Sequence, residues 1–152
     1  PVVINSGSLA PVQNVADHFL ANPLPLPHQN YIKDRLQKYA EAVRQLPEDK
    51  DDHMAVAVIL WDLELFFEVH EILEPKWIKA KGDKKLLLQA LIRAAGVYIN
   101  LELGYRERAA KIGGKAIPVL IRFQQDLQKH LDAEKLISAL QDLNPDPPQI
   151  SL

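Results

Sequence analysis

The apolar residues of this chain recur every three or four positions over long stretches, which is the spacing of a helix with one buried face. Glycine is scarce, with six residues among 152, and most of the glycines stand near the boundaries of these stretches. Both features favour helix over strand. The pattern therefore predicts an all-α fold, a compact single-domain bundle of about six to seven helices.

Proline residues and polar turns divide the chain into three expected segments. Residues 1–27 form an N-terminal strap with a short helix at 14–21, because the three prolines of residues 22–27 cannot donate backbone hydrogen bonds. Packing of this strap across its own domain is favoured over docking to an SH3-like partner. Residues 28–143 form the helical core, and residues 144–152, which contain further prolines, form a frayed tail.

Capping and turn residues set the expected boundaries of the core helices. Asp83 is predicted to cap a helix that runs to Leu103, and Gly104 is predicted to end it in the left-handed conformation. Asp132 is predicted to cap the last helix, and Pro75 to kink or restart the helix that contains it. The expected helices cover residues 29–46, from the acidic turn 48–52 to about Trp61, from about Asp62 to the turn at 81–85, 83–103, 105–112, 115–130 and 133–143.

The composition is that of an ordinary globular protein, with 47% apolar and 25% charged residues. A net charge of -2 gives no general attraction to nucleic acid or anionic lipid. The absence of cysteine excludes disulfides and thiolate sites and fits a reducing compartment. The first residues lack the pattern of a signal peptide, and the longest apolar run is too short for a membrane span. We therefore expect a cytoplasmic protein with no nucleic-acid partner and no membrane association, and a homo-oligomer is left open.

The segment FFEVHEILEPKW, residues 66–77, places a histidine and three carboxylates among large apolar side chains. On a wheel of about 100° per residue, His70 lies at the centre of the apolar face, and Glu74 lies inside the same face. Glu71 lies at the edge of this face, and Glu68 points to the opposite side. Because burying an ionised carboxylate without a partner is costly, Glu74 requires a cation, hydrogen-bond donors or a proton.

The next helix carries a narrow polar stripe formed by Gln89, Arg93 and Asn100. We expect this stripe to face the carboxylates of the preceding helix, because a short turn joins the two. The guanidinium of Arg93 is then predicted to pair with Glu71 or Glu74. The two amides complete the hydrogen bonds, and the histidine joins the resulting polar centre.

Three kinds of chemistry are compatible with this polar centre. His70 and Glu74 resemble part of the zinc-protease pattern H-E-x-x-H, but the sequence shows no third ligand and Arg93 opposes a dication. No cofactor is therefore predicted, and a divalent metal ion at these two residues stays an alternative. A second alternative is catalysis in which His70 acts as general acid or base, with Glu71 as the other catalytic candidate. The third is a structural network that is fully satisfied without a ligand.

The motif resembles the signature of the domain of unknown function 309 family, F-E-x-H-E-x-L-E-x-x-W followed by a helix that begins L-Q-x-L-I. The matching residues are Phe67, Glu68, His70, Glu71, Leu73, Glu74, Trp77, Leu88, Gln89, Leu91 and Ile92. The resemblance covers about residues 55–120 and implies an all-helical fold with a shared polar centre, but no reaction. This chain has Asp62 and Glu64 where the family usually has asparagine and glycine, which implies a weaker break between the helices, and Arg93 where glutamine is frequent.

These observations favour a noncatalytic domain that binds a small ligand or a protein partner around the polar centre. The alternative function is a hydrolase-like enzyme, with or without a metal ion, that uses the histidine and the glutamates of the motif. The candidate binding residues are His70, Glu71, Glu74, Trp77, Gln89, Arg93 and Asn100.

Overall fold

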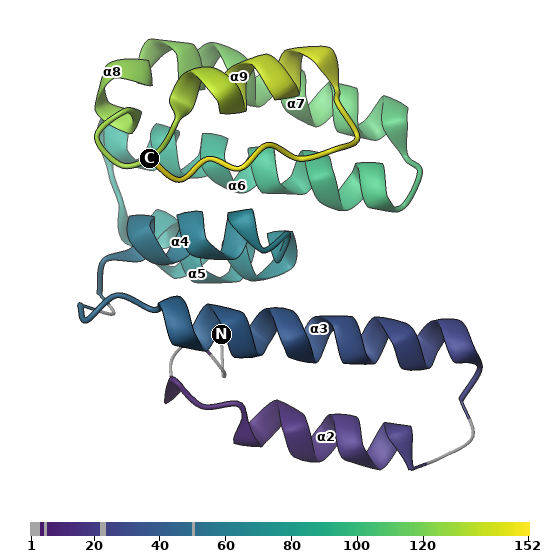
Figure 1. Ribbon diagram of the computed structural model, residues 1–152. Coiled ribbons are helices and arrows are strands. Elements are labelled where there is room, and N and C mark those ends of the chain that lie inside the picture. Colours follow the sequence, from purple (N-terminus) through teal and green to yellow (C-terminus); the bar gives the residue numbers. More distant parts are fainter. Residues whose placement is uncertain (1–3, 5, 22–23, 50) are drawn as a thin grey trace. The chain divides into compact units, whose positions relative to one another are not determined.

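Figure 1 shows the computed structural model, which describes residues 4, 6–21, 24–49 and 51–152. The described residues contain eight helices and no strand, which confirms the all-α fold with slightly more helices than expected. The contacts divide the chain into two compact units, unit 1 (residues 1–51) and unit 2 (residues 52–152), and each is described by itself. That the chain folds as a single domain stays a prediction. None of the helices in the described ranges is both long and apolar enough to span a lipid bilayer.

Unit 1 is a pair of helices, α2 (Ala10–Leu20) and α3 (Leu26–Gln45), which pack against each other (Figure 1). Each helix has a proline in its first turn, Pro11 in α2 and Pro27 in α3. Proline is tolerated there because the first N–H groups of a helix have no partner within the helix. We expected the prolines of residues 22–27 to keep the chain extended, but α3 already begins at Leu26, with Pro27 in its first turn. Residues 22 and 23 of the expected strap lie outside the described residues.

Unit 2 contains the other six helices of the described chain, and they pack mainly against their neighbours in sequence. α4 packs against α5, α5 against α6, and α6 against α7, while α9 returns to pack against α7 (Figure 1). Short connections between antiparallel helices are typical of such bundles. The bounds of the helices are α4 (His53–Asp62), α5 (Phe66–Lys79), α6 (Gly82–Glu102), α7 (Arg106–Arg122), α8 (Gln124–Leu127) and α9 (Ala133–Asp142).

Aspartate side chains cap two of these helices at their amino termini. Asp52 accepts a hydrogen bond from the Ala55 N–H, and Asp132 accepts one from the Lys135 N–H, both at 3.0 Å. The second bond confirms the predicted cap of the last helix, and the first confirms that a helix starts in the acidic turn. A cap of this kind typically stabilises a helix by about 1 kcal/mol.

Three helices of unit 2 end at a residue in the left-handed conformation. Glu64, Gly104 and Leu143 follow α4, α6 and α9, with φ values of 57°, 77° and 48°. In the first of these turns the Leu65 N–H donates to the Leu60 carbonyl at 2.8 Å, the bond that closes a helix in a Schellman motif. The prediction for Gly104 is confirmed. The break before α5 also forms, although a glutamate has to adopt the unfavourable conformation there.

α7 is one continuous helix, so the predicted interruption between residues 112 and 115 was wrong. Gly113 is buried against α6, where an added Cβ would lie 3.5 Å from Val97 Cγ2. The added Cβ would be at ordinary van der Waals distance, so Gly113 is an interior residue of a packed helix and not the end of one. The expected helix at 115–130 is wrong at its other end as well, because α7 stops at Arg122 and only the short α8 follows.

The predicted cap of α6 differs from the structure, and of the two outcomes expected at Pro75, a kink or a restart of α5, the restart does not occur. Lys81 is the N-cap of α6, and no side chain caps that helix. Asp83 lies one position inside the helix start, in the first turn, where its carboxylate accepts a hydrogen bond from Arg122 Nη2 at 3.0 Å. α5 continues through Pro75 to Lys79 without restarting.

An aromatic cluster in the core of unit 2 positions the start of α5. The rings of Trp61 and Phe66 lie 5.1 Å apart between centroids, and Tyr98 lies 5.2 Å from Trp61 and 5.0 Å from Phe66. All three residues are buried. Because they come from the end of α4, the start of α5 and the carboxy-terminal part of α6, their packing sets the direction in which α5 leaves its turn.

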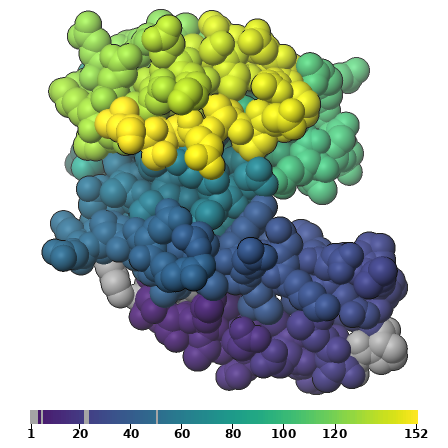
Figure 2. Space-filling model, viewed as in Figure 1, coloured from purple at the N-terminus to yellow at the C-terminus, as the bar shows by residue number. Residues whose placement is uncertain are grey.

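The carboxy-terminal segment, residues 144–152, is anchored and not frayed as expected. The Asp62 carboxylate accepts hydrogen bonds from the N–H groups of Ile150 at 2.7 Å and Ser151 at 3.1 Å, and the Ile150 side chain is buried. Figure 2 shows this segment, in yellow, at the surface of unit 2. Its prolines prevent a helix, but its main-chain groups find partners far away in the sequence, which local patterns do not report.

Candidate functional site

The motif at residues 66–77 forms most of α5, and the buried face of this helix is centred on Val69. Phe66, Val69 and Leu73 are 2%, 3% and 0% exposed. Val69 lies about 100° from His70 around the helix axis, so the histidine stands at the margin of the buried face. The predicted central position of His70 was therefore wrong.

Glu68 lies on the buried side of α5, although we predicted that it would point outward. It is 6% exposed, whereas Phe67, which we placed within the apolar face, is 57% exposed. α5 packs against both α4 and α6, so two neighbouring helices decide which arc is buried. The wheel identified that arc from hydrophobicity alone, and the exposed Phe67 moved its apparent centre toward His70.

His70, Glu71 and Glu74 converge at the half-buried edge of α5 and form the candidate site. Each offers one ligand atom, and these three atoms lie within 4.8 Å of one another. His70 Nδ1 lies 3.6 Å from Glu71 Oε1, and it is buried without a hydrogen-bond partner in the described part of the chain. The side chains of His70 and Glu71 are 35% and 32% exposed, so the group is accessible to ions from solution.

The predicted ion pair between Arg93 and Glu71 or Glu74 is not formed among the described residues. The Lys85 ammonium lies 5.3 Å from the centroid of the Trp77 ring, and counting back from this pair brings Arg93 level with about residue 69 of the antiparallel α5. That level is the buried turn before the three converging side chains.

The two amides of the predicted stripe do not complete a network with these carboxylates. Asn100 is buried and donates from Nδ2 to the Gly96 carbonyl of its own helix at 2.7 Å. By the same register it lies about eight residues, or about 12 Å, beyond the level of His70. Gln89 is half-buried near the middle of α6, and its side chain makes no hydrogen bond within the described ranges.

Trp77 lies one helical turn beyond Glu74 and is half-buried. One face of its ring meets the Lys85 ammonium, a cation–π contact. Its Nε1 is buried and has no hydrogen-bond partner among the residues described. An indole N–H donor without a partner thus follows the carboxylates on the same helix.

The three converging residues have the composition and charge of a divalent metal site. Two ligand atoms of one ion, each about 2.1 Å from it, lie about 3.4 Å apart in tetrahedral geometry, so the side chains would have to close by about 1 Å. Rotamer changes of half-exposed side chains readily provide such movement. Two carboxylates also balance the charge of a dication, and Arg93, which we expected to oppose one, makes no ion pair with them.

Glu71 is the member of this group that sequence reasoning named as a binding and catalytic candidate but not as a possible metal ligand. The wheel placed it about 100° from His70, at the edge of the apolar face. The glutamate side chain is long enough to bring its carboxylate back beside the imidazole. The sequence offers one signal for this group, a histidine followed directly by a glutamate, with a second glutamate four positions after the histidine.

Residues 54–112 match the model of a family described as Domain of unknown function (DUF309). This match confirms the resemblance drawn from the motif. It covers α4, α5, α6 and the first part of α7, and it includes all three residues of the candidate site. Searches of curated proteins and of solved structures found no match to the chain.

Proposed function

We propose that this DUF309 domain is a noncatalytic binding domain that holds a divalent metal ion through His70, Glu71 and Glu74. The observation that carries the proposal is the convergence of one imidazole nitrogen and two carboxylate oxygens within 4.8 Å on a single helix. The three residues span little more than one turn of a well-packed helix, so their backbone positions are held in place before an ion arrives.

The local electrostatics favour a cation at this position. Glu71 and Glu74 bring two carboxylates together, and no arginine or lysine in the described part of the chain pairs with either of them. Their mutual repulsion is relieved when a dication binds between them. The same ion supplies a partner to His70 Nδ1, a buried acceptor that lacks one.

The donor set favours a transition-metal ion such as Zn²⁺ or Mn²⁺. Calcium takes six to eight oxygen ligands, and magnesium keeps an octahedral shell rich in water, so neither matches a group with an imidazole ligand. Imidazole and carboxylate together suit zinc and its neighbours.

A small ligand can complete the coordination of this ion. Three protein ligands leave at least one position open on a four-coordinate metal. Trp77 Nε1, one turn away and without a partner in the described ranges, is a donor that an anionic or carbonyl-bearing ligand can use. This extends the expected small-ligand function to a ligand that binds the metal directly.

The metal site can be tested by titrating the full chain, freed of metal by a chelator, with ZnCl₂ and MnCl₂ in a calorimeter. We expect about one equivalent of metal, and a loss of at least about tenfold in affinity for each of His70→Ala, Glu71→Gln and Glu74→Gln. The matched control is His130→Asn combined with Glu134→Gln.

The control removes the same residue types at the same spacing from a position where they do not share a helix, since α9 begins only at Ala133. It should bind metal like the unmodified chain. Metal binding that none of the three substitutions in α5 weakens, or that the control weakens equally, would reject the proposal.

A metal-assisted hydrolase is the second candidate, and the open coordination position is the observation that favours it. A water molecule on such a metal ion becomes a nucleophile at neutral pH. The zinc-loaded chain can be assayed with activated esters and phosphate esters. Turnover that His70→Ala abolishes and the control variant retains would replace the noncatalytic proposal with this one.

A further inference from the structure

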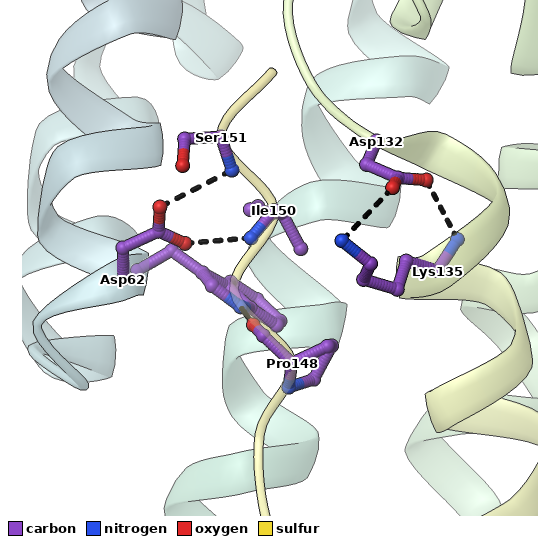
Figure 3. A network of polar contacts seen from close by, with 7 residues as sticks. Asp62, Asp132, Lys135, Pro148, Ile150 and Ser151 are labelled. Carbon is purple, nitrogen blue, oxygen red and sulfur yellow. Dashed lines mark hydrogen bonds and ion pairs between the residues drawn. The ribbon is translucent and has the colours of Figure 1, made fainter.

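The carboxy-terminal segment lies in a groove of unit 2 and is held there through its main chain. Figure 3 shows the Asp62 carboxylate accepting from the N–H groups of Ile150 and Ser151, at 2.7 and 3.1 Å. Trp61 Nε1 donates to the Pro148 carbonyl at 2.9 Å. The Asp132 N–H donates to the Ile150 carbonyl at 2.8 Å. Four main-chain groups within four consecutive residues are therefore bound.

One side chain of the segment anchors it in an apolar pocket. Ile150 is 3% exposed, and it lines a small apolar cavity together with residues of α4, α5, α6 and Leu131. A cavity of only about 10 Å³ remains beside it, too small for more than one water molecule. The walls of this pocket include Trp61, Val69, Leu73, Leu91 and Leu131.

These contacts are of the kind by which domains recognise extended peptides. Main-chain hydrogen bonds provide affinity that depends little on sequence, and one pocket selects the anchoring side chain. Pro147 and Pro148 stand just before the anchor and favour an extended backbone, which lowers the entropy lost on docking. The groove therefore recognises two features of the segment that it binds, an extended main chain and a branched aliphatic side chain.

The groove and its occupant belong to different parts of the chain. Trp61 and Asp62, which bind the segment, lie within the family match at 54–112, whereas residues 144–152 lie outside it. The segment also follows the last helix and contributes no helix of its own. The family match therefore contains most of the groups that bind the segment, on α4, α5 and α6, whereas Leu131 and Asp132 lie outside it. Because the segment itself forms no helix, it can be exchanged without unfolding one.

We propose that this groove is a peptide-binding site, which the carboxy-terminal segment occupies in the free protein and an extended segment of another protein occupies in its place. The partner segment carries a branched aliphatic anchor with proline two positions before it, as Pro148 precedes Ile150. Tethering gives the internal segment a high effective concentration, so it acts as a competitor that a partner must displace.

A fluorescent peptide with the sequence of residues 144–152, NPDPPQISL, is the probe, and fluorescence anisotropy with the full chain is the measurement. In the Ile150→Asp variant the internal segment should leave the pocket, because a buried carboxylate without a partner is unfavourable. We expect this variant to bind the peptide at least about tenfold more tightly than the unmodified chain. Ile150→Ser serves the same purpose if Ile150→Asp fails to fold, as judged by circular dichroism.

The role of Asp62 separates specific docking from nonspecific apolar binding. Adding Asp62→Ala to the Ile150 variant should weaken peptide binding by at least about tenfold, since two hydrogen bonds to a charged group are lost. Adding Asp142→Ala, which removes an exposed carboxylate from the end of α9, should leave peptide binding unchanged.

Three results would overturn the proposal. The first is a folded Ile150 variant that binds the peptide no better than the unmodified chain, and the second is binding that does not depend on Asp62. The third is a dimer of the unmodified chain in analytical ultracentrifugation that Ile150→Asp abolishes, because the occupant would then be a second copy of this chain and not another protein.

Discussion

At the scale of single residues, Tyr98 is a polar group that the core of unit 2 does not satisfy. Its ring stacks on Phe66 and meets the edge of Trp61, and the residue is 1% exposed. Its hydroxyl is buried and has no hydrogen-bond partner in the described ranges. Burial raises the pKa of Tyr98 to about 12, from an ordinary value of 10.0, because the phenolate would be removed from water.

This shift predicts a loss of stability at alkaline pH. Below the ordinary value the phenol is protonated in both states, so it contributes no pH dependence. Between about pH 10 and about pH 12 the unfolded chain loses this proton and the folded chain keeps it, so the free energy of unfolding falls by about 1.4 kcal/mol per pH unit. Tyr98→Phe should remove this part of the decline, which urea unfolding at about pH 9 and about pH 11 can measure.

Tyr105→Phe is the matched control, because Tyr105 is 56% exposed and therefore not removed from water by folding as Tyr98 is. It should leave the alkaline decline unchanged. At neutral pH, Tyr98→Phe should not lower stability, since it removes a buried hydroxyl that makes no hydrogen bond. An equal decline in the unmodified chain and in Tyr98→Phe would contradict the prediction.

The residues of the candidate site could be found from the sequence, but their orientation could not. The composition of the motif pointed to His70 and Glu74 because polar groups in an apolar run stand out. Which side of α5 is buried depends on helices that pack from two directions, and no wheel contains that information. The binding of residues 150 and 151 by Asp62 could likewise not be predicted from the sequence, because Asp62 and its partner Ile150 are 88 residues apart.

At the scale of the elements, capping side chains predicted the ends of the helices better than the positions of glycines did. Asp52 and Asp132 cap helices as their residue type suggests, and Gly104 takes the left-handed conformation. Gly113 and Gly114 lie inside α7, and Gly113 is buried there against α6. A glycine can end a helix or lie inside one, and the packing of the neighbouring helix determines which of the two occurs.

The left-handed turn before α5 offers a test of this reasoning. Glu64 adopts a φ of 57°, which favours glycine because a Cβ is unfavourable there. Glu64→Gly should therefore raise the free energy of unfolding by about 0.5 to 1 kcal/mol, whereas Gly104→Ala at the corresponding turn should lower it by a similar amount. Thermal or urea unfolding of both variants measures the difference.

The two substitutions are each other's control, since they change equivalent turns in opposite directions. An added Cβ at Gly104 meets no atom within 4 Å, so crowding does not confuse the result. If both substitutions change stability in the same direction, side-chain interactions outweigh the conformation of the turn.

At the scale of the whole molecule, one helix carries both proposed sites. Val69 and Leu73 line the apolar pocket of Ile150. The residues that directly follow them, His70 and Glu74, belong to the proposed metal site. The two sites therefore lie on adjacent faces of α5. The aromatic cluster that holds the start of this helix serves both of them.

Unit 2 should fold without unit 1, and this is the prediction that tests the expected single domain. Asp52 caps the first helix of unit 2, and the tail closes on Asp62 within the same unit. A fragment of residues 52–152 therefore retains the aromatic core, the metal group and the pocket. We expect it to be helical by circular dichroism and to unfold in one cooperative transition with heat.

A fragment of residues 63–152 is the matched control, because it lacks α4 and with it Trp61 and Asp62. It loses part of the aromatic cluster and both hydrogen bonds that hold Ile150 and Ser151, so we expect it to be largely unfolded. If residues 52–152 are also unfolded, unit 2 depends on unit 1, and the chain is the single cooperative domain that its length and pattern predict. A folded fragment with the stability of the full chain would instead show that residues 52–152 are an autonomous domain, in which the family match at 54–112 is completed by α7 to α9 and the anchored tail.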